Sequence, residues 1–165
     1  MDSLVDQTLA AMERECDLYG ALLALAEEQR TCLVKGAAPR LEEIVAEQSD
    51  LLRRAAHASR RVESHVGLLG RSLQLPAGPR GADLAQALPA EAAARYQGLR
   101  RRLLSMADDL RRLGQINQRL AIGALGYIDF SLRLIGGVGD GCRPYAHDGS
   151  PPAHEPGRLV LDTRV

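Results

Sequence analysis

The sequence predicts an all-α protein, in which an antiparallel helical hairpin and a long third helix form an elongated three-helix bundle or coiled coil. Three long stretches repeat apolar residues at every third and then fourth position, the spacing of one helix face. Aromatic residues make up only 3% of the chain, and β-branched residues are scarce before residue 138, which argues against sheets. We expect one helical domain over residues 1–135, with helices at about 3–35, 40–72 and 90–135, and a disordered, flexible tail over 136–165.

The first helix is expected to begin near Ser3, a suitable N-cap, and to end before Gly36. Its apolar face is interrupted only by Arg30 and includes Cys16. A cysteine on such a face is more often a small buried apolar residue than a reactive thiol, so we assign Cys16 to the core. The acidic residues lie off this face and are interpreted as a solvated or hairpin-facing surface rather than as catalytic groups.

The second helix has an apolar face that includes Gln48 and His65 and is widened by Val45 and Leu52. A histidine on an apolar face is more often a hydrogen-bonded core residue than a metal ligand. His57 lies eight residues before His65, which is too far for both to bind one metal. We therefore expect no metal site on this helix.

The third helix follows a Pro- and Gly-rich loop over residues 74–89, in which one helical turn is expected near 83–88. Ten of the twelve positions on its apolar face, from Tyr96 to Leu134, are apolar. Asn117 lies inside this face. A lone polar residue at such a position costs stability and can fix the register of neighbouring helices, which is the role we expect for Asn117.

Beyond Asn117 the third helix becomes apolar on most of its faces, so it must bury itself in its own protein or in a partner. Gly123 and Gly126 each cost about 1 kcal/mol relative to Ala in a helix interior. We expect this part to be loosely helical or closely approached by another backbone. The residues expected to contact a partner are Leu110, Leu113, Ile116, Asn117, Leu120, Ala124, Leu125, Tyr127, Ile128 and Leu132.

Charge is unevenly distributed, although the net charge of the chain is zero. Residues 1–50 carry 11 acidic and 4 basic residues, whereas residues 51–112 carry 12 basic and 5 acidic ones. An acidic first helix suits basic neighbours in a hairpin. The arginine clusters of residues 53–61 and 100–112 could instead contact phosphates, but no aromatic residues alternate with them as stacking platforms. We favour a solvated helical face paired with the acids of the first helix.

The remaining features exclude several classes of function. The three cysteines form no CxxC pair, which argues against a disulfide framework or a zinc cluster and fits a reducing cytosol. The N-terminus has no secretory signal pattern, and the apolar run 120–135 is too short to cross a bilayer. No nucleophile–base–acid set is visible, and the glycine-rich run 136–141 lacks the Lys-Ser/Thr ending of a phosphate loop. We expect a soluble, cytoplasmic protein that is no enzyme and binds no cofactor.

Three short motifs resemble a known family. Residues 47–52, Glu-Gln-Ser-Asp-Leu-Leu, resemble an E-K-x-x-L-L motif, with Gln48 in place of Lys. Residues 113–120, Leu-Gly-Gln-Ile-Asn-Gln-Arg-Leu, resemble L-N-x-x-N-x-x-L-L, with Gly114 in place of the first Asn and Ala121 in place of the last Leu. Residues 145–149, Tyr-Ala-His-Asp-Gly, resemble a terminal Y-x-x-x-G motif. Together they resemble the FlgN-type flagellar export chaperones over most of the chain.

The resemblance implies a cytoplasmic chaperone of flagellar type III secretion. Such a protein would bind the C-terminal helical segments of the hook–filament junction (hook-associated) proteins, prevent their premature assembly and deliver them to the membrane export gate. Tyr145 and Gly149 match the motif that contributes to docking at that gate. Two alternatives stay open: a nucleic-acid-binding helical protein that uses the arginine clusters, and a structural coiled coil that binds itself. Salt dependence would separate them, because phosphate binding weakens steeply with salt and apolar packing does not.

Overall fold

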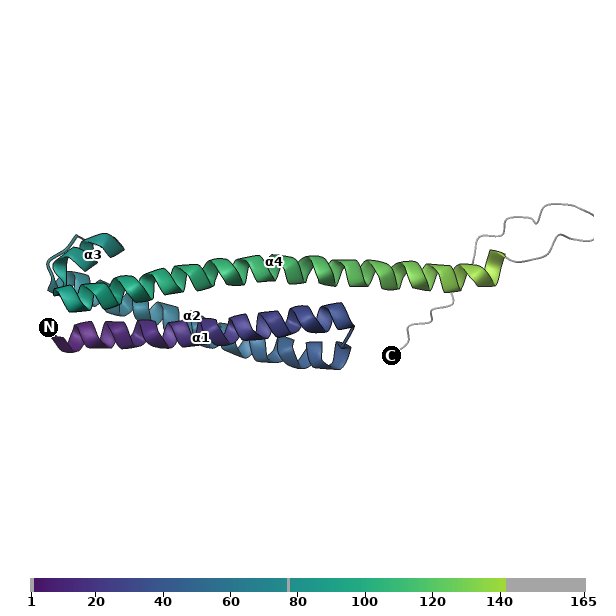
Figure 1. Cartoon of the computed structure of the whole chain (residues 1–165), viewed down its shortest axis with the longest axis horizontal. Helices are drawn as coiled ribbons and strands as arrows, with labels where there is room; N and C mark the ends of the chain where they lie inside the picture. The colour runs from purple at the N-terminus through teal and green to yellow at the C-terminus, as the bar shows by residue number, and fades with distance from the viewer. Residues whose placement is uncertain (1, 77, 142–165) are drawn as a thin grey trace, which may run out of the picture. The chain divides into compact units, whose positions relative to one another are not determined.

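The computed structural model describes residues 2–76 and 78–141, and within them it contains four helices and no strand, which confirms the all-α class. The helices are α1 (Asp2–Lys35), α2 (Ala38–Ser72), α3 (Gly81–Ala87) and α4 (Ala90–Gly141) (Figure 1). The chain divides into two compact units, residues 1–121 and 122–165. The first unit contains α1, α2, α3 and the first part of α4.

A tight turn joins α1 to α2, which pack against each other as an antiparallel hairpin (Figure 1). Gly36 has a φ of 68°, a left-handed conformation that glycine adopts without a Cβ penalty. The backbone N–H of Ala37 then donates to the carbonyl of Cys32 at 3.0 Å and closes the end of α1. Pro39 occupies the first turn of α2, where its missing N–H costs nothing, so α2 begins two residues before the expected residue 40.

Arg40 ties this end of the hairpin together. Its Nε donates to Oε1 of Glu28 on α1 at 2.7 Å, and its Nη1 donates to Glu43 and Glu47 on its own helix at 2.8 and 2.9 Å. The Arg40 hydrogen bonds lower the pKa of the Glu28 carboxyl, and the three carboxylates raise the pKa of Arg40. Because these side chains are largely solvated, the network fixes geometry more than it adds stability.

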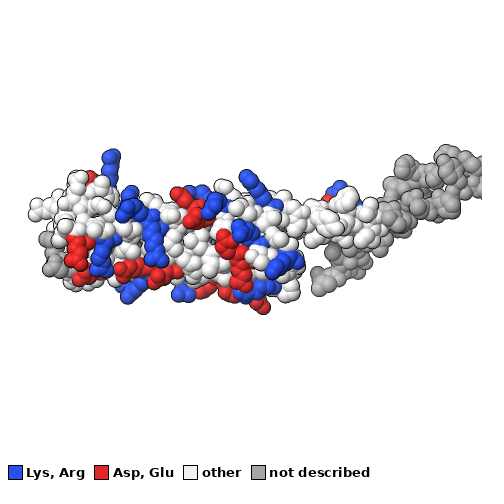
Figure 2. Space-filling model, in the orientation of Figure 1, with Lys and Arg blue, Asp and Glu red and all other residues white. Residues whose placement is uncertain are grey.

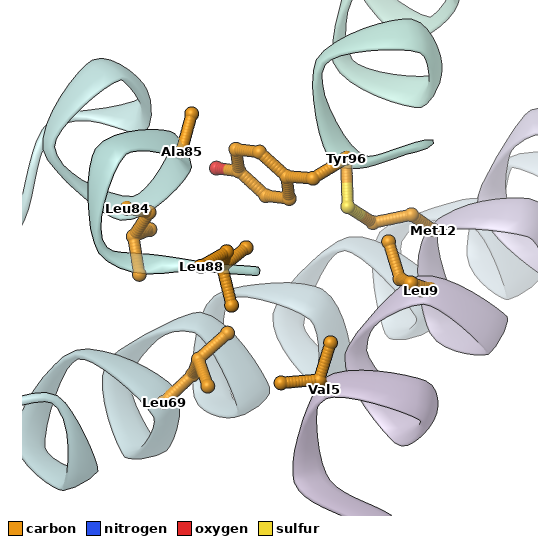
Figure 3. Packing of buried hydrophobic residues seen from close by; sticks show 8 residues of the cluster. All are labelled: Val5, Leu9, Met12, Leu69, Leu84, Ala85, Leu88 and Tyr96. Carbon is orange, nitrogen blue, oxygen red and sulfur yellow. The ribbon is translucent and has the colours of Figure 1, made fainter. Parts of the chain in front are cut away.

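A short helix closes the opposite end of the bundle, where all four helices meet in one apolar cluster. Figure 3 shows the Tyr96 ring lying over Leu88, with its hydroxyl directed toward Ala85 of α3. Burial raises the pKa of the Tyr96 hydroxyl. The cluster comprises Val5, Leu9 and Met12 of α1, Leu69 of α2, Leu84 and Ala85 of α3, and Leu88 and Tyr96.

The loop between α2 and α3 approaches α2 so closely that only glycine fits at position 70. A Cβ on Gly70 would lie 2.7 Å from Cγ of Pro79. At the end of this loop, the backbone N–H of Arg80 donates to Oδ2 of Asp83 at 3.0 Å, which caps α3. Where the sequence predicts a single helical turn at 83–88, the structure has a helix, Gly81–Ala87, which contributes residues to the core.

Two sequence expectations about single residues have different outcomes. Cys16 is 1% exposed, which confirms its place in the core, and burial raises the pKa of its thiol. His65 is only partly buried, and its Nδ1 has no hydrogen-bond partner within the described residues, so the expected hydrogen bond at that nitrogen is absent.

The first part of α4 runs parallel to α1. Arg95 pairs with Glu13 at 3.1 Å, and farther along both helices a Cβ on Gly20 would lie 3.4 Å from the Met106 methyl group. Helix α4 ends at Gly141 rather than near Ile135, so residues 136–141, expected in the tail, are helical.

Candidate functional site

The second unit presents the apolar part of α4, which we call the exposed apolar segment and define as residues 122–135. Eight large apolar side chains in it are each more than half exposed: Ile122, Leu125, Tyr127, Ile128, Phe130, Leu132, Leu134 and Ile135. On the face drawn in Figure 2, charged side chains gather over the first unit, whereas the later part of α4 shows few of them. Water-exposed apolar side chains in such number are typical of an interaction surface.

The ten residues expected to contact a partner fall into three groups by exposure. Leu113 and Asn117 are 4% and 5% exposed and therefore belong to the interior of the first unit. Three more are partly buried: Leu110, Ile116 and Leu120. Five are exposed on the second unit: Ala124, Leu125, Tyr127, Ile128 and Leu132. The exposed members of the expected set therefore all lie at or after Ala124, whereas the earlier members are buried or partly buried.

Buried Asn117 joins α4 to the hairpin through polar contacts. Its Nδ2 donates to the carbonyl of Ala26 at 2.8 Å and to Oε1 of Gln29 at 2.9 Å. The same oxygen accepts a 3.3 Å hydrogen bond from Nε2 of Gln48 on α2. This layer of three amides links three helices, and a one-turn slip of α4 would leave its donors unpaired. The expected role of Asn117 in fixing register fits this geometry.

The layer also contains residues that the sequence pattern did not connect. Gln48 was visible as a polar residue on an apolar face, but Gln29 was not singled out. Oδ1 of Asn117 has no hydrogen-bond partner within the part of the chain that the structure describes. An unpaired buried acceptor costs free energy. The layer therefore lowers stability somewhat while it defines the register of the helices.

Local side-chain contacts support the helix of the exposed apolar segment, whereas its two glycines weaken it. Asp129 and Arg133 form an ion pair at 2.8 Å, and the Ser131 hydroxyl donates to the carbonyl of Tyr127 at 2.8 Å. Apart from the adjacent residues and the nearby backbone of α4 itself, no described atom lies within 4 Å of a Cβ built on Gly123 or Gly126. Neither glycine is therefore explained by a close approach of this chain's own backbone, one of the two options expected.

The chemistry available in this segment is that of apolar association. Its ionisable pair, Asp129 and Arg133, is already joined, and no other charged side chain lies in residues 122–135. Across the described residues, no group of three or more His, Cys, Asp and Glu side chains could hold a metal ion. No helix in residues 2–76 or 78–141 is long and apolar enough to cross a membrane.

The arginine clusters pair mainly with acids on their own helices. Arg53 contacts Asp50 at 2.9 Å, and Arg111 contacts Asp108 at 2.6 Å, in each case three residues apart. Arg112 contacts Asp109 in the same way. Ion pairs between helices exist at Arg40 and Arg95 rather than in these clusters, so the expected pairing of the clusters with the first helix is wrong at these positions.

The expected export-gate residues, Tyr145 and Gly149, lie outside the described residues, as does the tail from residue 142. The model of a protein family described as "FlgN protein" matches residues 1–153. No curated protein and no solved structure matches the chain.

Proposed function

Because the chain belongs to the FlgN family and is thus a flagellar chaperone, we propose that it binds the C-terminal helical segments of hook–filament junction proteins. In this proposal it keeps these clients from assembling early and delivers them, in the cytoplasm, to the membrane export gate of flagellar type III secretion. It uses no cofactor, catalyses no reaction and binds no nucleic acid.

The exposed apolar segment is the observation that carries this proposal. Eight large apolar side chains on one helix form a surface against which the apolar face of an amphipathic client helix can pack. Each large aliphatic side chain that a partner covers contributes roughly 1.5–3 kcal/mol before the cost of ordering both partners. A client helix bound there has its own apolar face covered, which prevents it from pairing with another subunit.

The first unit has a separate task in this proposal. The hairpin and the amide layer of Asn117 hold the first part of α4 in one register. The exposed apolar segment continues directly from that part as the same helix. The bundle thus acts as a scaffold, and the binding energy comes from the second unit.

The decisive experiment compares two pairs of truncations by calorimetric titration with a peptide from the C-terminal helix of a junction protein. Leu125→Ala with Ile128→Ala removes two exposed side chains from the segment. Val45→Ala with Leu52→Ala is the matched control, because these side chains are about as exposed but lie on α2. We expect the first pair to weaken binding about a hundredfold and the control pair to leave it nearly unchanged.

Unchanged affinity in the Leu125/Ile128 variant, with helicity intact by circular dichroism, would move the client site elsewhere. Loss confined to the Val45/Leu52 variant would place it on the outer face of α2. Salt also discriminates: an apolar contact keeps its affinity as ionic strength rises, whereas contacts between arginine and phosphate lose it steeply.

Gate docking is assigned to Tyr145 and Gly149, on the strength of the family motif alone. Tyr145→Ala should weaken capture by the purified gate protein and leave client affinity unchanged. If client affinity fell together with gate capture, the two tasks would not be divided in this way.

A further inference from the structure

A hollow of about 290 Å³ lies between α1 and α2 and is lined by residues of the first unit. From α1, Arg14 lines it together with Ala11 and Leu18, which lie on the same helix face. Ala11 has a short side chain and is buried, so it leaves space where the two helices meet. The floor of the hollow is therefore apolar.

The walls of the hollow are basic. From α2, Arg54, His57 and Arg61 line it, and Ala58 adds a second small residue to the floor. Arg54, His57 and Arg61 are three and then four residues apart, so they share one face of α2. Arginine side chains from two helices, all of them exposed, thus line the same small space.

This arrangement differs from the other charged contacts between helices. Arg40 meets Glu28 and Arg95 meets Glu13, so opposite charges face each other in both. Within the described residues, Arg14 and Arg61 have no carboxylate oxygen within 4.0 Å. Arg54 has only Asp50 of its own helix, at 3.7 Å. Like charges that border one cavity repel each other, and an anion placed between them relieves that repulsion.

We propose that this hollow binds a carboxylate side chain from an acidic segment of a partner protein, with an apolar neighbour of that side chain resting on the floor. Arginine forks pair with carboxylates through two parallel hydrogen bonds. An apolar side chain next to the carboxylate can pack on the apolar floor, whereas an inorganic anion has no apolar group to pack there. No aromatic side chain lines the hollow, and the net charge of the chain is zero, both of which favour a protein partner over nucleic acid.

The test uses the full chain labelled with ¹⁵N and two tetrapeptides, acetyl-Leu-Glu-Glu-Leu-amide and its Gln-Gln counterpart. We expect the acidic peptide to shift the side-chain Nε–H signals of Arg14, Arg54 and Arg61 in a saturable way. The glutamine peptide should bind at least about tenfold more weakly, because it lacks the charge-assisted hydrogen bonds. Inorganic phosphate and a single-stranded DNA oligonucleotide are titrated in parallel.

Two double variants remove equal charge. Arg14→Gln with Arg61→Gln should weaken the acidic peptide about tenfold or more. Arg101→Gln with Arg119→Gln, on exposed positions of α4, should not. Four results would overturn the proposal: absence of saturation, equal binding of both peptides, equal loss in both variants, or tighter binding of phosphate or the oligonucleotide at the same arginines. Circular dichroism confirms that each variant is folded.

Discussion

Residues 90–121 and 122–135 belong to the same helix, yet most large apolar side chains of the first part are buried or partly buried and those of the second are exposed. In the first part, Tyr96 and Leu113 are each no more than 5% exposed, because they face the bundle. In the second, Leu125 and Ile128 are more than half exposed. The amide layer of Asn117 lies near the end of the buried part. A continuous apolar pattern can thus be buried over one length of a helix and exposed over the next.

The largest expected effect is the difference in stability between two variants that each lose one leucine, one in each part of α4. Leu113→Ala should lower the free energy of unfolding by about 2–5 kcal/mol, because it removes buried contacts and leaves a cavity. Leu125→Ala should change it by less than about 0.5 kcal/mol, because that side chain is already exposed. Urea unfolding followed by circular dichroism measures both. Equal losses would mean that the segment is packed within the free protein, contrary to the comparison.

A smaller effect is expected at the amide layer. Asn117→Ala removes hydrogen bonds to Ala26 and Gln29 and should cost about 1–2 kcal/mol. Gln118→Ala, next in sequence and exposed, is the matched control and should be nearly neutral. A loss at Gln118 as large as at Asn117 would show that the effect does not come from the layer, because Ala is the better helix former at both positions.

The glycines of the exposed apolar segment should respond locally. Gly123→Ala with Gly126→Ala should stabilise the helix by about 1 kcal/mol per site, because nothing lies within 4 Å of either Cβ position. Hydrogen exchange of the amides of residues 122–135 should slow several-fold, while the unfolding midpoint of the bundle stays constant. Gly70→Ala provides the contrast, because its Cβ would meet Pro79 and destabilise the first unit. Unchanged exchange would show that the glycines do not limit helicity in the segment.

The smallest effect concerns acid. The Arg40 hydrogen bonds lower the pKa of Glu28 in the folded chain, so their stabilisation is present above the unfolded carboxyl pKa. It is lost as pH falls through the lowered folded value. Glu28→Gln should therefore flatten the fall of the thermal midpoint on acidification, whereas Glu63→Gln, exposed on α2, should not. An unaltered pH profile in Glu28→Gln would mean that the Arg40 network is not formed in solution.

Much of the fold follows from periodicity, because a 3–4 apolar spacing is compatible only with a helix that buries one face. Asn117 was recognisable in the same way, as an interruption of that face. The partner Gln29 was not, because its contact spans 88 residues and nothing local marks it. The sequence also did not predict that α3 contributes to the core, because a seven-residue helix is too short to show an apolar period.

The position of the candidate site was predicted only in part. The apolar pattern marked residues 110–132 as one surface, but a pattern states that a face must be covered and not what covers it. The bundle itself covers Leu113, whereas Leu125 and Ile128 lie exposed. Only the three-dimensional packing separates these two outcomes.

The 88-residue separation between Gln29 and Asn117 also orders events during synthesis. The hairpin of α1 and α2 closes through a turn of two residues, so its contacts are local and form rapidly. Chains emerge from the ribosome N-terminus first, so this hairpin can be complete before α4 is translated. The exposed apolar segment is translated after the hairpin, so part of its scaffold can already be folded when it emerges. A nascent chain therefore does not present its most aggregation-prone stretch while the hairpin is being made.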